Sequence, residues 1–231
     1  NALVGEKVAI VTNKPQTTRN RICGVRTRGE SQFVFVDTPG LHKARTRLGD
    51  YMVKVVRESV ADVDAVLLLV EPIPNIGAPE AELIARIREL NVPAVLVINK
   101  IDTVRKDELL AVMQVYGAQH DFAAILPISA KSGEGVEELL DVLEQFLPQG
   151  PRLFPEDMIT DQPERQVCAE IVREKLLLCL DKEIPHGTAV EITKFSERDD
   201  EVIELDATIY CEKASHKGII IGKQGAMLKK I

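Results

Sequence analysis

One acidic residue directly follows an apolar segment, at a position where a metal ion could bind. Residues 33–36 read Phe-Val-Phe-Val, a run of aromatic and β-branched residues typical of a buried strand. Asp37 comes next, and Thr38, Pro39 and Gly40 after it cannot continue a central strand. Open α/β sheets bind ligands at the carboxyl ends of their strands, so Asp37 is a candidate Mg²⁺ ligand, with Thr38 and Pro39 beside a nucleotide. The N–H of Gly40 could approach a γ-phosphate, although turns of this kind also occur without a ligand.

Asn99, Lys100 and Asp102 follow a second apolar segment, residues 94–98, and suit recognition of guanine. Guanine presents the adjacent donors N1–H and N2–H₂, and the carboxylate of Asp102 can accept from both. Adenine offers neither, so it would leave a desolvated carboxylate unpaired at a cost of about 1–3 kcal/mol. Asn99 can tie the loop and meet the base edge, while the aliphatic stem of Lys100 can cover the ring. In isolation, an ordinary polar turn is the alternative.

Ser129, Ala130 and Lys131 follow the next apolar segment, where backbone N–H groups could reach guanine O6. Three residues carry almost no specificity alone. The order of all the motifs carries more: Thr-Thr-Arg at 17–19 lies in a loop, and the three other motifs each follow an expected strand. Together they favour a guanine nucleotide site over a chance arrangement.

The elements that must position these motifs alternate along the chain. Apolar strands are expected at 65–70, 94–98 and 124–128, and helices at 48–60, at 79–90, from 107 and at 135–146. Residues 22–27 and 32–36 read as a hairpin. Because the strands show no polar alternation, the pattern predicts a single doubly wound, mixed α/β sheet with helices on both faces. Residues 1–147 are the expected extent of this first domain.

A second, smaller α+β domain is expected after a linker at 148–162, which is rich in proline. It begins with an amphipathic helix at 163–180, followed by strands at 188–194 and 202–212. Gly222, Lys223, Gln224 and Gly225 then match the GxxG loop of type II KH domains, which clamps the backbone of single-stranded RNA. Residues 213–231 hold five lysines, including Lys217, and no acid. GxxG alone is a weak motif, and a solvated helix face is the alternative for the lysines.

Composition and net charge exclude some classes of function and partner. The chain has 231 residues, 45% hydrophobic and 28% charged, with a net charge of −7. Such a chain is no uniformly basic nucleic-acid binder, so an RNA site must be local and DNA is not expected as a partner. The four cysteines show no metal-ligand spacing and are expected to be buried thiols in a reducing cytosol. No segment reaches membrane-spanning length.

Residues 1–147 resemble the GTPase domain of the Era family, translation-factor-type GTPases that carry a KH domain. The similarity is closest at residues 14–19 and 37–43. It implies that Thr18 ligates Mg²⁺ in the GTP state, that Asp37 holds Mg²⁺ and that Gly40 meets the γ-phosphate. It also implies that Asn99, Lys100 and Asp102 select guanine, with Ser129, Ala130 and Lys131 closing the base pocket. The implied ligands are GTP or GDP with Mg²⁺.

Two departures from the usual GTPase pattern affect the expected activity. The glycine-rich GxxxxGK[S/T] loop that binds phosphates is not in the sequence, so we expect that loop to precede Asn1. We interpret both ends of the sequence as truncated. These residues alone are expected to bind GTP poorly. Leu41 stands where many GTPases have a water-orienting Gln, which implies slow hydrolysis. His42 reads as an exposed loop residue rather than a base.

The resemblance implies a GTP-switched protein that binds small-subunit ribosomal RNA through Lys217, Gly222, Lys223, Gln224 and Gly225 and assists small-subunit assembly. It implies a monomer in the cytoplasm, with peripheral contact to the inner membrane left open. One alternative is a nucleotide-gated signalling or membrane-associated GTPase without an rRNA role. A relative of tRNA-modifying GTPases is a third reading, without a second catalytic domain to support it.

Overall fold

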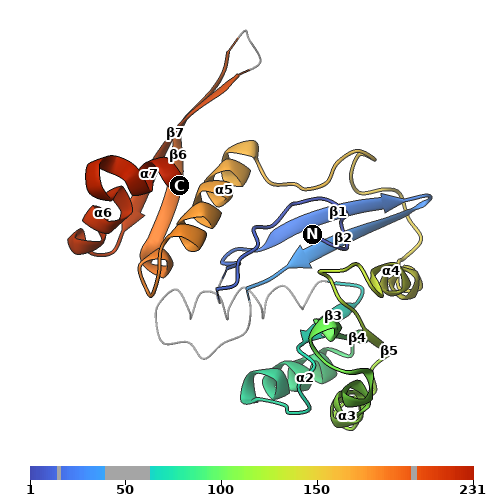
Figure 1. Cartoon of the computed structure of the whole chain (residues 1–231). Helices are drawn as coiled ribbons and strands as arrows, with labels where there is room; N and C mark the ends of the chain where they lie inside the picture. The colour runs from blue at the N-terminus through green and yellow to red at the C-terminus, as the bar shows by residue number, and fades with distance from the viewer. Residues whose placement is uncertain (15–16, 40–62, 199–201) are drawn as a thin grey trace.

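The computed structural model describes residues 1–14, 17–39, 63–198 and 202–231 (Figure 1). Its strands are β1 (Ile22–Arg28), β2 (Ser31–Asp37), β3 (Val66–Val70), β4 (Ala94–Ile98), β5 (Ala124–Pro127), β6 (Thr188–Glu197) and β7 (Ile203–Cys211). Its α-helices are α2 (Ala78–Leu90), α3 (Lys106–Gly117), α4 (Val136–Glu144), α5 (Glu164–Cys179), α6 (Ala214–Ile221) and α7 (Ala226–Lys230). The 3-10 helices are η1 (Ile101–Thr103), η2 (Pro185–Gly187) and η3 (Lys223–Gly225). Gly40, Leu41, His42 and the helix expected at 48–60 lie outside the described residues.

Strands β3, β4 and β5 form a parallel sheet in that order, as their uniformly apolar sequences predict. All five residues of β4 are buried, because helices cover both faces of the strand. Leu96 and Ile98 lie in a core with α2 and α3, whereas Val95 and Val97 lie in a core with α4 and with Phe33 of β2. The expected α/β fold with helices on both faces is therefore confirmed for this part of the chain.

Strands β1 and β2 form an antiparallel hairpin in which Ile22 pairs with Asp37 and Arg28 pairs with Ser31. Gly29 in the turn has φ +58°, a conformation that glycine adopts without strain. Among the described residues, no ladder joins this hairpin to β3. The single mixed sheet expected from the sequence is thus present as a hairpin and a separate parallel sheet, packed together through Phe33.

The C-terminal part, residues 163–231, contains α5, the β6–β7 hairpin and the helices α6 and α7. A small core of Leu176, Leu180 and Ile220 joins α5 to α6. Apolar and polar residues alternate along residues 203–209 of β7, which predicts one buried face. Ile203 is nevertheless 49% exposed, because the hairpin tip extends beyond α5 (Figure 1). Helix α6 has no counterpart among the elements that the sequence predicts.

The expected linker, residues 148–162, contains no helix or strand and lies along the β1–β2 hairpin. The N–H of Val25 donates to the carbonyl of Ile159 at 2.8 Å, and the hydroxyl of Thr160 donates to the carbonyl of Cys23 at 2.7 Å. The side chain of Gln32 accepts from the N–H groups of residues 153 and 154 at 2.9 Å each. The linker is therefore fixed to the hairpin by hydrogen bonds.

All four cysteines are free thiols, as expected, but only Cys23 is buried. The expectation that all four are buried is wrong: the two cysteines of α5 are half-buried, and so is Cys211 of the largely exposed strand β7. In the described part of the chain, no helix combines the length and the apolar character that a membrane crossing requires.

Candidate functional site

Two loops at the ends of neighbouring parallel strands contain the residues expected to select guanine. These strand-end loops are residues 99–102, after β4, and residues 129–134, after β5. The N–H of Ala130 donates to Oδ1 of Asn99 at 3.0 Å, and the hydroxyl of Ser129 donates to Oδ1 of Asp102 at 2.8 Å. The structure thus brings together both sets of predicted residues, because parallel strands end at the same edge of their sheet.

Each strand-end loop is also held internally. Asn99 donates its N–H to the carbonyl of Val70 at 2.9 Å and accepts at Oδ1 from the N–H of Lys100 at 2.8 Å. Ser129 is fully buried, and its N–H and carbonyl bond to the backbone of Glu134 and Gly133 at 2.9 Å each. Hydrogen bonds from the same part of the chain therefore hold the oxygen atoms of Asn99 and Asp102 in place before a base binds.

One contact at these loops could not be read from the motifs. The ammonium of Lys100 donates to the carboxylate of Glu71, the residue directly after β3. The indication in the sequence was that an acidic residue, Glu71, directly follows an apolar strand. Lys131 and Ala130 are exposed and line an open cavity of about 600 Å³ beside the turn formed by residues 1–5.

The two predicted metal ligands lie in contact. The hydroxyl of Thr18 donates to Oδ2 of Asp37 at 3.2 Å. A hydroxyl and a carboxylate supply the oxygen donors that Mg²⁺ prefers, so these residues fit the ion, which would neutralise phosphate charge there. Desolvation raises the pKa of Asp37, and the Thr18 hydroxyl opposes the shift. Asp37 is nevertheless exposed at the end of β2, so a cation can reach it from solvent.

The neighbours of Asp37 are only partly described. Thr38 is half-buried and Pro39 is buried at the end of β2. Gly40, the residue expected at the γ-phosphate, lies outside the described residues, so its role stays a prediction.

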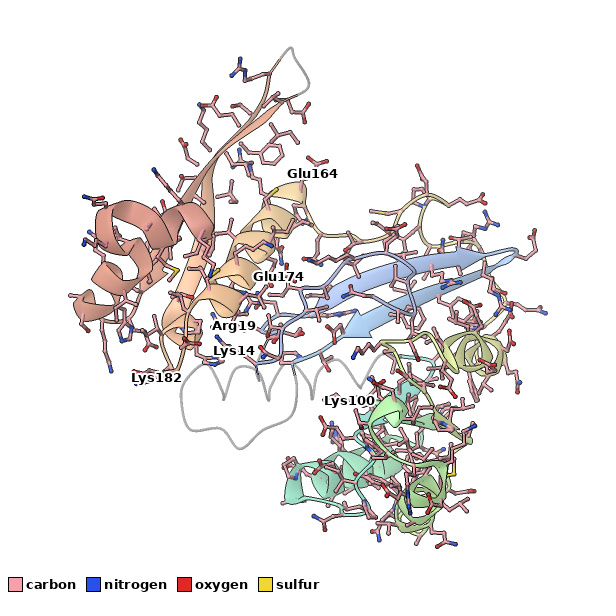
Figure 2. The ribbon with its side chains drawn as sticks, viewed as in Figure 1. Lys14, Arg19, Lys100, Glu164, Glu174 and Lys182 are labelled. Carbon is pink, nitrogen blue, oxygen red and sulfur yellow. The ribbon has the colours of Figure 1, made fainter. Side chains whose placement is uncertain are left out.

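The segment that leads to Thr18 is fixed to the C-terminal part, a feature that sequence reasoning missed. We call residues 7–14 and 17–19 the anchored segment. Its Lys14 donates to the carbonyl of Leu177 at 2.5 Å, and its Arg19 donates to the carbonyl of Thr188 at 2.7 Å. Figure 2 shows Lys14, Arg19 and Glu174 gathered between α5 and the end of the β1–β2 hairpin. Burial lowers the pKa of His186 there, and the charges of Arg19 and Lys14 act in the same direction.

The GxxG residues join α6 to α7 in a tight turn. Gly222 has φ +72°, and a Cβ at this position would lie 2.7 Å from the backbone nitrogen of Met227, so only glycine fits. Gly225 has φ +77° and Gln224 has φ +52°. Lys217, Lys223 and Gln224 are exposed around this turn. A helix, an exposed glycine turn with lysines and a second helix are the parts that a phosphate-backbone clamp requires.

Comparisons with known proteins find matches for both the N-terminal and the C-terminal part of the chain. The family model described as 50S ribosome-binding GTPase matches residues 1–100, and the KH domain model matches residues 183–231. GTPase Era of Ruminiclostridium cellulolyticum is 52% identical over 231 residues, which is 100% of this chain and 78% of that protein. GTPase Era of Syntrophus aciditrophicus is 49% identical over 232 residues and is covered to 76%.

Solved structures give the same result. The crystal structure of Era in complex with MgGDPNP and nucleotides 1506–1542 of 16S ribosomal RNA matches with a TM-score of 0.94 at 35% identity. An Aquifex aeolicus Era variant bound to GDP·AlF₄⁻ matches with a TM-score of 0.94 at 36% identity. Each match covers 100% of this chain and 79% of the other.

The fold and the strand-end loops therefore define a GTPase joined to a KH domain. Since relatives about 50% identical align along the whole sequence, the chain belongs to the Era family of GTPases.

Proposed function

We propose that this protein binds GTP, hydrolyses it slowly and binds small-subunit ribosomal RNA during assembly of the small ribosomal subunit. The observation that carries the proposal is the match, along the whole chain, to an Era structure that holds both MgGDPNP and 16S ribosomal RNA. The paired strand-end loops and the GxxG turn supply the two kinds of site that such an activity requires.

Guanine is selected by Asp102, whose carboxylate accepts from N1–H and N2–H₂ of the base. Among the described residues, only Oδ1 of Asp102 takes a hydrogen bond, from Ser129, so Oδ2 is available to the base. Asn99 holds the loop closed, the stem of Lys100 covers the ring, and Ala130 and Lys131 border the base. A site built to satisfy guanine donors rejects adenine because the acceptors that a bound base covers would stay unpaired.

Thr18 and Asp37 hold Mg²⁺, and Gly40 contacts the γ-phosphate. When it is bound, the ion supplies positive charge against the phosphate oxygens. Hydrolysis is slow because Leu41 has no group that could orient water. These 231 residues contain no GxxxxGK[S/T] motif, so we expect them to bind guanine nucleotides more weakly than a form that carries such a loop.

Ribosomal RNA binds at the GxxG turn, where Gly222 and Gly225 admit the RNA backbone and Lys217, Lys223 and Gln224 contact it. Residues 148–162 serve as the linker between domains at 1–147 and 163–231. The protein acts as a cytoplasmic monomer, and its contact with the inner membrane, where it occurs, is peripheral.

RNA binding tests the proposal directly. The measurement is the affinity for an RNA with the sequence of nucleotides 1506–1542 of 16S ribosomal RNA, determined as a function of salt. Gly222→Asp should abolish binding, because its side chain has no space and its charge repels phosphate. Gly150→Asp is the matched control, since a Cβ there meets open space in the linker. Replacing Lys217 and Lys223 with Ala should reduce the slope of log affinity against log salt by about one unit per phosphate contact.

If Gly222→Asp binds this RNA as tightly as the unaltered protein, the RNA-binding role of the GxxG turn is wrong. Tight binding of vesicles with anionic lipid headgroups, without RNA binding, would instead favour a membrane-associated GTPase.

A further inference from the structure

Two charged side chains of α5 are buried against the N-terminal part of the protein. Among the described residues, Arg173 and Glu174 are the only Arg, Lys, Asp or Glu residues that are buried, each 4% exposed. Burying a charge costs several kcal/mol unless partners satisfy it. Their partners therefore indicate what the pair is for, and those partners lie in the anchored segment.

Glu174 binds the beginning of the anchored segment. Its Oε2 accepts from the ammonium of Lys7 at 2.7 Å, and its Oε1 accepts from the backbone N–H of Val11 at 2.9 Å. Both oxygen atoms of the carboxylate are thus used. Because one partner is a backbone group, the contact fixes the path of the chain as well as the position of a side chain.

Arg173 binds the other end of the segment. Its Nη2 donates to the backbone carbonyl of Thr17 at 2.5 Å, and its Nε donates to Oε1 of Glu170 at 2.8 Å. Glu170, one turn earlier on α5, neutralises the guanidinium and orients it. The result is a rigid donor aimed at the residue directly before Thr18.

Arg19, directly after Thr18, is anchored as well. Its Nη1 donates to the carbonyl of Thr188 at 2.7 Å, and its Nη2 donates to the carbonyl of His186 at 2.8 Å. Both neighbours of Thr18 are therefore held by the C-terminal part, while residues 17–19 themselves belong to no helix or strand.

We infer that Arg173 and Arg19 are positioning residues for Thr18, so that the KH part of the molecule completes the Mg²⁺ site of the GTPase. This inference rests on the proposed role of Thr18 as a metal ligand in the GTP state. With no regular structure around it, the Thr18 hydroxyl is held near Asp37 by the anchors on its two sides. The metal affinity of the triphosphate state thereby depends on contact between the two parts of the chain.

A purely structural role for Arg173 makes a different prediction. An ion pair that only holds the two parts together would affect complexes with GDP and with GTP alike. A positioning residue acts through Thr18, which ligates the metal only beside a γ-phosphate. The difference between the two nucleotide complexes therefore separates the two roles.

The test uses the protein preceded by the phosphate-binding segment of an aligned relative, with Mn²⁺ as a paramagnetic substitute for Mg²⁺. Mn²⁺ affinity is measured by electron paramagnetic resonance in complexes with GDPNP and with GDP. Arg173→Met should weaken Mn²⁺ binding about tenfold with GDPNP, the value of one charge-assisted hydrogen bond, and less than about twofold with GDP. Arg165→Met is the matched control, because Arg165 lies on the same helix over the ring of Phe195, within the C-terminal part.

A double-mutant cycle with Thr18→Ala completes the test. The effect of Arg173→Met should disappear in the Thr18→Ala background, and an effect that persists there, or one equal in both nucleotide complexes, overturns the inference. If Thr18→Ala alone leaves Mn²⁺ affinity with GDPNP unchanged, the proposed role of Thr18 fails instead. Should Arg173→Met not fold, as judged by circular dichroism, Arg19→Met tests the second anchor with the same measurements.

Discussion

The strand-end loops and the anchored segment contribute to the same candidate nucleotide site but are held in different ways. Both lack long regular elements. Asn99 and Asp102 are held by groups on the neighbouring strand ends, such as Ala130 and Ser129, within one sheet. Thr18 is held through partners about 160 residues away in the chain, such as Arg173.

The difference concerns what can change each half of the site. The strand-end loops inherit the rigidity of a parallel sheet whose central strand is wholly buried. The anchored segment depends on hydrogen bonds between two parts of the molecule, each of which has its own core. Base recognition should therefore be insensitive to events at the GxxG turn, whereas the metal half can respond to anything that moves α5.

The largest expected effect removes the charge that recognises the base. Asp102→Asn replaces an acceptor for two guanine donors with an amide that presents one acceptor and one donor. In a form that carries a phosphate-binding loop, GTP affinity should fall on the order of 10²-fold, since hydrogen bonds to charged groups contribute about 1.5–3 kcal/mol. The measurement is titration with a fluorescent guanine nucleotide.

Xanthosine nucleotides supply the matched control for Asp102→Asn. Xanthine has a carbonyl in place of the guanine amino group, so the variant should bind XTP better than the unaltered protein does. A variant that keeps its preference for GTP over XTP would contradict the assignment of Asp102. Mn²⁺ affinity at the Thr18 side should stay unchanged once nucleotide is saturating. That result would show that the strand-end loops and the anchored segment contribute independently.

A smaller effect is expected from the backbone where the second strand-end loop leads into α4, at Gly133 and Gly135. Gly135 has φ +77°, and a Cβ there would lie 2.7 Å from the carbonyl oxygen of Pro127, so Gly135→Ala combines strain with a backbone clash. Gly133 has φ +85° with open space around it, so Gly133→Ala introduces strain alone. We expect losses of about 3 and about 1 kcal/mol in unfolding free energy, respectively. Equal losses in denaturant titrations would show that the clash at Pro127 is relieved by movement of the loop.

The strand-end loops could be predicted from the sequence because their determinants are local. Each is preceded by a continuous apolar strand, and parallel neighbours must end at one edge, which places Asn99 near Ala130 without further information. The chemistry of Asp102 likewise follows from its residue type. The contact of Lys100 with Glu71 was missed because a surface ion pair leaves no repeating pattern.

The anchored segment could not be predicted for a physical reason. Arg173 and Arg19 donate to backbone carbonyls, and every residue has a carbonyl, so no sequence pattern marks the partner. Helix α5 reads as an ordinary amphipathic helix, in which Arg173 and Glu174 would be expected to face solvent. Helix α6 was missed because its glycine and its three consecutive isoleucines are more typical of a strand.

The smallest expected effect is a weakening of the contact between Glu174 and the anchored segment as pH falls. Burial of Glu174 acts to raise its pKa, but the hydrogen bonds from Lys7 and from the N–H of Val11 outweigh burial, and the pKa is lowered. A carboxyl whose pKa is lower in the folded state stabilises that state fully above its unfolded pKa, about 4.3, and loses this stabilisation as pH falls through the folded value. The stabilisation that Glu174 gives to the anchored segment should thus be constant from pH 7 to about pH 5 and should decrease in more acidic solution.

Comparison of Glu174→Gln with the unaltered protein isolates this contribution, with Glu164→Gln, an exposed position on the same helix, as the control. Thermal unfolding should show Glu174→Gln to be less stable at pH 7, and the difference should shrink below about pH 4, as protonation makes the native carboxyl resemble the amide. Glu164→Gln should change little at either pH. A difference for Glu174→Gln that is the same at pH 3 and pH 7 would mean that the charge of Glu174 does not hold the segment. In the strand-end loops, Asp102 accepts a hydrogen bond from a neutral hydroxyl. Arg173 and Arg19 would then be the charged groups that distinguish the anchored segment from those loops.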